Sequence, residues 1–291
     1  MRRYFRYSSM GRNSDEVQIE TEIRLLIHSI PAARPGFGRE KIEALLQRYD
    51  NYCKLQNCKN AKEIDALVFG TIHAYIAFQK ACCPEFDLEF IPPRFRDVQA
   101  NGCAGVSSDS LCDFSNLTFS DFAMSRHSLR YYGSLPIQIE TIKKAVSLAQ
   151  TAPSACNRQP THVYACVNTE KIDTIMAFHG GMKGFGRPQA ILAVTGALGA
   201  YTSEYERNTV HVDCGLFAMN LLYALHYYGL ATCPIIWGSE PDNDKKIRKI
   251  LDIPECETVA LLITVGSYPA DSYRFAKAQR KEINTVFDVI N

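Results

Sequence analysis

The chain has 291 residues, 46% of them hydrophobic, and its formal net charge is +1 at pH 7. This length allows one large domain or two small ones. A net charge this close to zero gives no field for nucleic acid or an acidic membrane, so neither is expected as a partner. The most apolar segment, residues 212 to 230, contains Asp213, Asn220 and His226. It therefore predicts a buried helix rather than a membrane span.

The cysteines and the N-terminus bear on metal binding and location. Eleven cysteines are present, and none forms a Cys-x-x-Cys pair. Tetrahedral zinc sites are usually marked by paired short spacings, so we expect no metal site and mostly buried, reduced thiols. The basic N-terminus, Met1 to Arg6, is not followed by the apolar stretch of a signal peptide, which predicts a cytoplasmic protein.

The first third of the chain has the pattern of a small helical unit. Apolar residues recur at helical spacing in three segments. These segments are Ile19 to Ile30, about Ile42 to Tyr49, and about Ala61 to Lys80. Residues Gln99 to Asn116, with their Gly, Ser and Asn, predict a linker or an ordered loop. We therefore expect a helical N-terminal extension over residues 1–118 and a second domain over residues 119–291.

A cationic cluster opens the central stretch of the chain. Arg126 and Arg130 lie four residues apart, with Ser128 between them. A guanidinium offers a planar fork of hydrogen-bond donors and a serine hydroxyl adds a neutral one, so the cluster suits a phosphate. The other interpretation of an Arg-x-x-x-Arg pattern is a solvated surface.

An amphipathic helix and an amide-rich turn follow this cluster. Ser134 is the expected N-cap, Pro136 suits the first turn, and the helix ends before Pro153. The turn carries three side chains that can donate and accept hydrogen bonds, as the edge of a planar heterocycle requires. They are Ser154, Asn157 and Gln159.

Strands and helices alternate after the turn. Apolar runs predict strands at Thr161–Val167, Ala190–Thr195, Ala231–Trp237 and Thr258–Val265. Helices are expected at Val210–Tyr228 and Asp242–Leu251. The glycine-rich segment His179 to Gly186 matches no nucleotide-binding fingerprint. Taken alone, this alternation favours an α/β domain with a parallel sheet.

The cationic cluster and the turn together resemble the FMN-dependent nitroreductase family. That family opens with an Arg-[Arg/His]-Ser-x-[Lys/Arg] segment, and a Pro-Ser-x-x-Asn-x-Gln-Pro turn follows about one helix later. Residues 126–130 and 153–160 match both motifs, and the resemblance extends from about Phe119 to Asn291. It implies an α+β fold with a mostly antiparallel central sheet surrounded by helices. Some members carry a helical N-terminal extension of this kind.

The resemblance also implies which residues bind FMN. Arg126, Ser128 and Arg280 would hold the phosphate, and Arg130 would lie near the ribityl chain and the N1/O2 edge, where a cation favours the reduced form. The family has a Lys-x-Arg in the tail, but Ala278 occupies the lysine position here. The second tail cation would then be Lys277 or Lys281. His127 follows the motif and is included among the candidate contacts.

Two further segments would meet the flavin rings. The turn residues Pro153, Ser154, Asn157 and Gln159 would do so, typically from the partner subunit. The segment Thr232 to Gly238 matches the family segment that lies against the flavin, with contacts from Pro234, Ile235, Ile236 and Trp237. A backbone N–H of Ile236 or Trp237 would point at N5, where hydride arrives.

The implied reaction is a ping-pong oxidoreduction. NAD(P)H would reduce the flavin, and an electron-poor small molecule such as a nitroaromatic or a quinone would then accept the hydride. No catalytic side chain is expected, because the cofactor carries the chemistry. The helix Val210–Tyr228 is too apolar to face water all round, which predicts a homodimer with FMN at its interface. The alternatives are dehalogenation or substrate oxidation within the same superfamily, or a flavin-free binding or scaffold protein.

Overall fold

The computed structural model describes residues 14–29, 35–55, 61–96, 106–110, 112–238, 241–270, 272–276, 278 and 280–290. The chain divides into two compact units. One comprises Met1–Ser107 together with Ala276–Asn291, and the other is Ser108–Phe275. The expected domain boundary near residue 118 stays a prediction.

The first unit is built on the three predicted helices. They are α2 (Ser14–Ser29), α3 (Arg39–Cys53) and α4 (Ala61–Cys82), followed by the short helix η2 (Pro93–Phe95). Their apolar faces form one core, with Ile42, Leu45 and Ile64 fully buried in it. The C-terminal residues of this unit include η7 (Ile283–Thr285).

The second unit contains a four-stranded antiparallel sheet with the strand order β2-β3-β5-β4. The strands are β2 (Thr161–Cys166), β3 (Ala190–Ala197), β4 (Leu230–Ile236) and β5 (Glu257–Ser267). All four lie where the sequence predicts strands. The α+β fold with a mostly antiparallel sheet is confirmed. The parallel sheet that alternation alone favours is wrong, because the order of elements does not fix strand direction.

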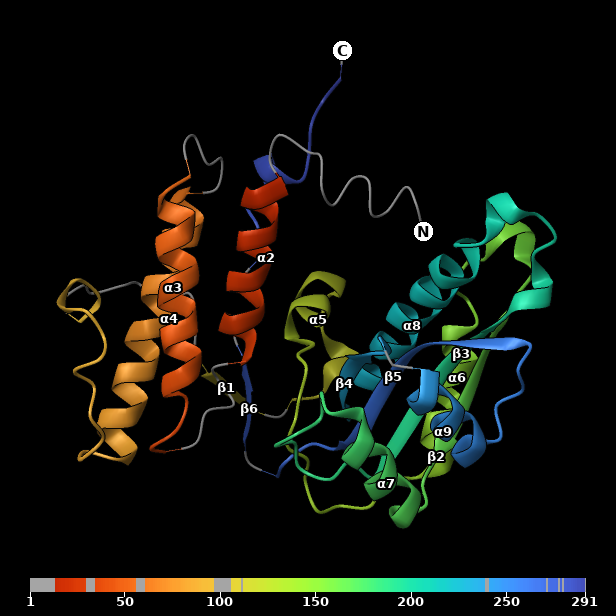
Figure 1. Ribbon diagram of the computed structural model, residues 1–291. Helices are drawn as coiled ribbons and strands as arrows, with labels where there is room; N and C mark the ends of the chain where they lie inside the picture. The colour runs from red at the N-terminus through yellow and green to blue at the C-terminus, as the bar shows by residue number, and fades with distance from the viewer. Residues whose placement is uncertain are drawn as a thin grey trace. The chain divides into compact units, whose positions relative to one another are not determined.

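Helices cover both faces of this sheet (Figure 1). On one face lie α6 (Ile139–Ala149) and α8 (Thr209–Tyr227), and on the other lie α7 (Thr169–His179) and α9 (Pro241–Leu251). Consecutive strand residues point to opposite faces, so Leu192 packs with α8 while Ala193 packs with α7 and α9. Both predicted helices of this region, α8 and α9, are confirmed.

Helix α6 begins later than the sequence predicts. Ser134 does not cap it, and its N-cap is Gln138. Tertiary hydrogen bonds hold the preceding backbone instead: the Gly133 N–H donates to the Ser267 carbonyl, and the Gln189 side chain donates to the Leu135 carbonyl. A Cβ at residue 133 would lie 2.2 Å from the Tyr268 carbonyl oxygen. Close packing on the end of β5 therefore prevents an earlier helical turn here.

Several short elements were not predicted. The region expected to be a linker contains β1 (Val106–Ser110), which pairs with β6 (Ser272–Ala276) in a two-stranded sheet. The others are α5 (Phe119–Ser125), α7, η3 (Phe114–Asn116), η4 (Ala155–Asn157), η5 (Leu198–Ala200) and η6 (Glu204–Glu206). None of the helices in the described residues combines the length and hydropathy needed to cross a bilayer.

Candidate functional site

The cationic cluster lies along the free edge of the sheet. Strand β4 is an edge strand, and Ser128 forms a parallel bridge with Thr232 on its outer side. The Leu129 N–H donates to the Thr232 carbonyl at 2.8 Å. Two motifs about a hundred residues apart in the sequence, 126–130 and 232–238, are therefore brought side by side.

The polar side chains of the cluster converge on β4. Burial raises the pKa of the Cys233 thiol, and Arg130, a hydrogen bond with Ser128, and Arg126 each act to lower it. All three side chains are thus close enough to Cys233 to affect its ionisation. The Arg130 guanidinium also lies 5.4 Å from the centre of the Phe185 ring. Two guanidiniums and a hydroxyl beside one strand edge form a donor set suited to an anion.

A buried histidine anchors the start of this segment. His226 on α8 is joined to Ser125 through Nε2 at 2.8 Å and to the Tyr268 hydroxyl through Nδ1 at 2.9 Å. Ser125 immediately precedes Arg126. Burial, with the nearby charges of Arg126 and His127, lowers the pKa of His226 to about 4, so the ring is neutral at pH 7. The sequence marked His226 only as a polar residue in an apolar segment.

His127, the remaining member of the cluster, packs against an aromatic ring. Its imidazole stacks on Phe275 of β6, with ring centroids 3.5 Å apart and an interplanar angle of 6°. Stacking of this kind fixes the imidazole in one orientation. A direct contact between His127 and a cofactor stays a prediction.

The end of β4 presents backbone groups on the same free edge. Main-chain groups alternate sides along a strand. The Thr232 carbonyl faces away from β5, whereas the Cys233 carbonyl faces β5 and accepts from the Thr264 hydroxyl. Ile236 is four residues after Thr232, so its N–H and C=O also face away from β5. Pro234 faces the same way and has no N–H, which suits an edge position. Of the two candidate donors, Ile236 is therefore the one whose N–H lies on the open side.

The amide-rich turn has an unusual backbone. Cys156, Asn157 and Gln159 have φ angles of 52°, 54° and 47°, in the left-handed region that non-glycine residues rarely adopt. Two backbone N–H groups of the turn donate to side chains that support this conformation. The Gln159 N–H donates to Ser154 Oγ at 2.9 Å, and the Ala155 N–H donates to both carboxylate oxygens of Asp213, at 3.1 and 3.2 Å. Backbone strain of this kind is common at binding sites.

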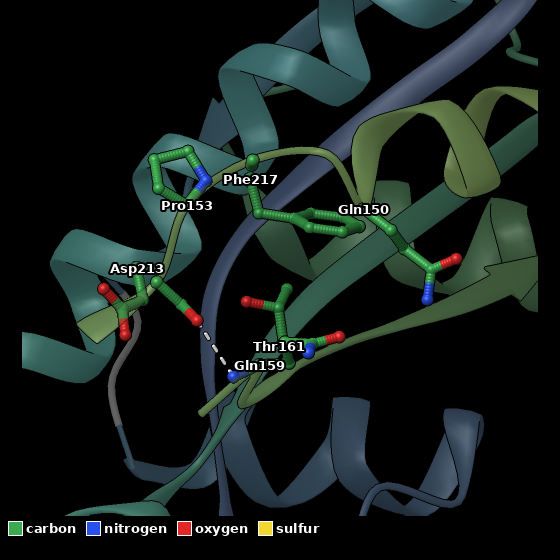
Figure 2. Close-up of a pocket in the computed structure, with 8 residues that line it drawn as sticks. Gln150, Pro153, Gln159, Thr161, Asp213 and Phe217 are labelled. Atoms are coloured by element: carbon green, nitrogen blue, oxygen red, sulfur yellow. Dashed lines mark hydrogen bonds between the residues drawn. The ribbon is translucent and has the colours of Figure 1, made fainter. Parts of the chain in front are cut away.

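Asp213 is the central acceptor beneath the turn. It is a buried residue of α8, and its Oδ2 accepts the Tyr201 hydroxyl at 2.5 Å. Figure 2 shows Asp213 and Phe217 of α8 with Pro153, Gln159 and Thr161 around a small pocket. Its cavity volume is about 90 Å³, far below the several hundred Å³ typical of a complete ligand site. The pocket that the described residues form at this turn is therefore smaller than a complete ligand site.

The turn and the cationic cluster lie at opposite corners of the sheet. Thr161 next to the turn pairs with Gly196, and Gly196 pairs with Thr258 on β5, whereas Thr232 beside the cluster pairs with Val265. Three inter-strand steps and seven residues along β5 separate the corners by roughly 25 Å, at about 4.8 Å per strand and 3.3 Å per residue.

The tail residues expected to bind the phosphate belong to the other unit or lie outside the described residues. Arg280 belongs to the unit of α2 to α4, and its Nη1 donates to the Ala278 carbonyl. Lys281 lies 4.0 Å from the buried Glu20 of the same unit, so an ion pair already engages it. Lys277 lies outside the described residues. A meeting of Arg280 with Arg126 at one phosphate stays a prediction.

Comparisons with known proteins agree with this fold and these motifs. The model of the nitroreductase family matches residues 123–194 and 175–267. A protein of Archaeoglobus fulgidus named "Putative NADH dehydrogenase/NAD(P)H nitroreductase" is 30% identical over 158 residues, which cover 53% of this chain and 87% of that protein. The chain belongs to the nitroreductase family. Membership in this family makes it an oxidoreductase by descent.

Solved structures show the same nitroreductase fold. A nitroreductase-like protein from Streptococcus mutans matches with a TM-score of 0.52 at 21% identity, covering 60% of this chain and 98% of that one. A nitroreductase family protein from Streptococcus pneumoniae matches with a TM-score of 0.50 at 18% identity, covering 60% and 100%. The 60% of this chain that these structures cover is similar in length to residues 119–291, which carry the sequence motifs.

Asp213 should be important for the stability of this nitroreductase-family domain. Replacing Asp213 with alanine leaves the partly buried Ala155 N–H and Tyr201 hydroxyl without this acceptor, at a cost for each toward the lower end of the about 1–3 kcal/mol for an unsatisfied buried group. We expect Asp213→Ala to lower the free energy of unfolding by about 3 kcal/mol, measured by urea denaturation. Asp213→Asn keeps one acceptor oxygen and should cost less. The control is Asp242→Ala on the exposed surface of α9; equal effects of Asp213→Ala and Asp242→Ala would contradict this role.

His226 should make the stability of the domain depend on pH. Its folded pKa of about 4 lies below the ordinary value of about 6.5. Between these values the unfolded chain binds a proton that the folded chain does not, so stability falls as the pH drops from 6.5 to 4. The loss approaches about 3 kcal/mol at about 1.4 kcal/mol per pH unit. Denaturation at pH 7, 6, 5 and 4.5 should show this slope in the wild type. A His226→Gln variant with the same slope would contradict it.

Proposed function

We propose that the chain is a homodimeric, FMN-dependent NAD(P)H oxidoreductase that reduces electron-poor small molecules. One observation carries the proposal: the Arg126–Arg130 segment lies on the free edge of β4, whose last residue presents its N–H on that same edge. The anion-binding donors and a fixed backbone donor are therefore parts of one surface. FMN needs both kinds of group, one for its phosphate and one for N5 of its ring system.

The donor set fits the phosphate end of FMN. Arg126 and Ser128 would hold the phosphate oxygens through charge-assisted and neutral hydrogen bonds. Arg130 would lie toward the N1/O2 edge, where its positive charge favours reduction of the flavin. In our proposal Arg280 supplies a further guanidinium, and Lys277 is the remaining tail cation because Lys281 pairs with Glu20.

The ring end would be shared between two subunits. The roughly 25 Å between Thr161 and Thr232 supports this proposal, because a second copy could bring its own Ser154, Asn157 and Gln159 to the site. Pro153 borders the same turn. The partial pocket at the turn is consistent with this arrangement, since one chain forms only half of each site.

Helix α8 offers the surface for such a dimer. Val212, Leu216, Met219 and Tyr227 are 58%, 45%, 38% and 43% exposed. Their successive spacings of four, three and eight residues place them on one helical face, because residues at these separations lie on the same side. An exposed apolar stripe on an otherwise buried helix is the pattern of an interface. The same helix carries Asp213, so the stripe and the strained turn adjoin each other.

When bound, FMN would accept a hydride from NAD(P)H and pass it to the electron-poor acceptor in two alternating half-reactions. The residues of the chain bind and orient the cofactor. The Ile236 N–H would face N5, and the side chain of Ile236, 82% exposed, would border the space for the nicotinamide and the acceptor. Pro234, Ile235 and Trp237 would complete this wall. Trp237 is fixed by a hydrogen bond from its indole N–H to Asp244 at 3.1 Å.

The proposal is tested by purifying the protein with added FMN and recording its visible spectrum. We expect a yellow protein that NADH or NADPH bleaches in an anaerobic stopped-flow experiment, and that a quinone or a nitroaromatic reoxidises. A flavin that substrates rather than nicotinamides reduce would instead favour the substrate-oxidising alternative. Turnover of a halogenated aromatic acceptor with halide release would favour the dehalogenase.

A flavin-free scaffold protein is the second candidate. The observation that favours it is Ala278 in the position of the family lysine. A protein that stays colourless at a large excess of FMN, with no retained flavin after gel filtration, would support the scaffold and overturn the flavoenzyme. In either case, we propose that the helical residues 1–118 act as an extension to the domain of residues 119–291.

A further inference from the structure

His179 contacts the last residue of β4 from the end of helix α7. Its Nε2 lies 3.1 Å from the Ile236 carbonyl oxygen, and its ring centroid lies 5.6 Å from that of Trp237. Its Nδ1 is buried and makes no hydrogen bond within the described residues. The imidazole is therefore held by a single polar contact, to the backbone of β4.

The chemistry of this contact fixes the proton position. A carbonyl oxygen can only accept, so Nε2 carries the hydrogen and donates it. Burial lowers the pKa of His179, and the hydrogen bond with the Ile236 carbonyl raises the pKa by a smaller amount. In the turn after α7, the Gly181 N–H donates to the His179 carbonyl, which holds residue 181 close to the imidazole. A Cβ at residue 181 would lie only 3.2 Å from the ring, so glycine at this position leaves room for it.

We infer that His179 is a positioning residue for the backbone of Ile236. The inference rests on the proposed function, which assigns the Ile236 N–H to the flavin N5. The N–H and C=O of one residue face the same side while that residue stays extended, so a donor on the Ile236 carbonyl favours the extended conformation that keeps the N–H on this side. Among the described residues, no strand pairs with β4 on that side at Ile236, and the Ile236 side chain is mostly exposed. Ile236 pairs with Leu261 of β5 on the inner side, and His179 adds a hydrogen bond on the outer side.

The hydrogen bond also polarises the neighbouring peptide. The Ile236 carbonyl and the Trp237 N–H belong to one peptide group, and a donor at the oxygen strengthens the N–H as a donor. This effect exists without any cofactor. It gives a measurement on the flavin-free protein that is independent of the proposed function.

The test compares His179→Phe, which keeps a ring beside Trp237 but has no donor, with His179→Gln, whose amide can donate to the same carbonyl. In the flavin-free protein, the Trp237 amide resonance in ¹H–¹⁵N spectra should move upfield in His179→Phe and return toward the wild-type position in His179→Gln. His162→Ala, an exposed histidine on β2 at the other edge of the sheet, is the control and should leave this resonance in place.

With FMN bound, the ¹⁵N resonance of flavin N5 should shift in His179→Phe toward that of FMN lacking a donor at N5. The two-electron reduction equilibrium should change about tenfold, equivalent to about 30 mV, and His179→Gln should restore both values. Unchanged Trp237 and N5 resonances in His179→Phe, or equal shifts in Phe and Gln variants, would overturn the inference. A wild type that binds no FMN but shows the Trp237 effect would overturn the proposed function while retaining the His179–Ile236 contact.

Discussion

Replacing Arg126 with alanine is expected to weaken FMN binding by about 100-fold. Arg126 lies at the start of the segment that docks on β4, close enough to influence Cys233 and His226. A charge-assisted hydrogen bond to a phosphate contributes about 1.5–3 kcal/mol, and a guanidinium can form two of them. The dissociation constant is measured by flavin fluorescence titration in the wild type and in Arg126→Ala.

Two comparison variants separate the loss of charge from the loss of fold. Arg126→Lys keeps the charge but not the planar fork, and we expect it to lose about tenfold in affinity. Arg94→Ala removes an exposed arginine that pairs with the exposed Asp50 and lies over the Phe95 ring, and this variant should bind FMN as the wild type does. Retention of wild-type affinity in Arg126→Ala, with an intact circular dichroism spectrum, would show that the phosphate lies elsewhere.

Replacing Leu216 with arginine is expected to convert the protein to a monomer and to remove the flavin. Leu216 is at the middle of the exposed stripe on α8, where an arginine would have to be buried without a partner in the dimer. The cost of burying an unpaired charge is several kcal/mol per copy, and a symmetric dimer contains the change twice. Molar mass is measured by light scattering after gel filtration, together with the flavin absorbance of each peak.

The matched control is Val167→Arg. Val167 is 54% exposed, similar to Leu216. It directly follows β2, whereas the turn directly precedes β2, so Val167 lies at the opposite end of this strand from the turn. We expect it to leave both mass and flavin content unchanged. A wild-type protein that elutes as a monomer and still holds FMN would refute the shared site, and with it the explanation for the distance between the two motifs.

The sequence was a good guide to the local elements of the second unit. All four strands of its main sheet and helices α8 and α9 lie within a few residues of their predicted positions, because each has a strong apolar pattern. Strand direction was not readable from that pattern, and only the family resemblance predicted the antiparallel sheet. The N-terminus of α6 was misplaced because hydrogen bonds from Gly133 and Gln189 to distant residues override the local capping pattern.

In the candidate site too, residues in short motifs could be predicted from the sequence, whereas residues that act through distant contacts could not. Residue types suited to a phosphate and a heterocycle predicted Arg126 to Arg130 and the turn as candidates, and the family resemblance added the β4 segment. The supporting residues were not found, because their roles depend on contacts across the fold. Asp213, 58 residues from Ala155, and His226, 101 residues from Ser125, are single polar residues in an apolar helix. A buried ionisable residue inside such a helix was the only sequence feature that pointed to them.

The left-handed residues of the turn at Cys156, Asn157 and Gln159 have a consequence for assembly. Such conformations cost on the order of 1–3 kcal/mol each, and Asp213 and Ser154 already hold the loop in place within a single chain. Two copies that meet would therefore present a rigid recognition loop, with little conformational entropy left to lose. In the proposed dimer, association would then lose little conformational entropy at this loop, because the loop is already ordered when each chain has folded.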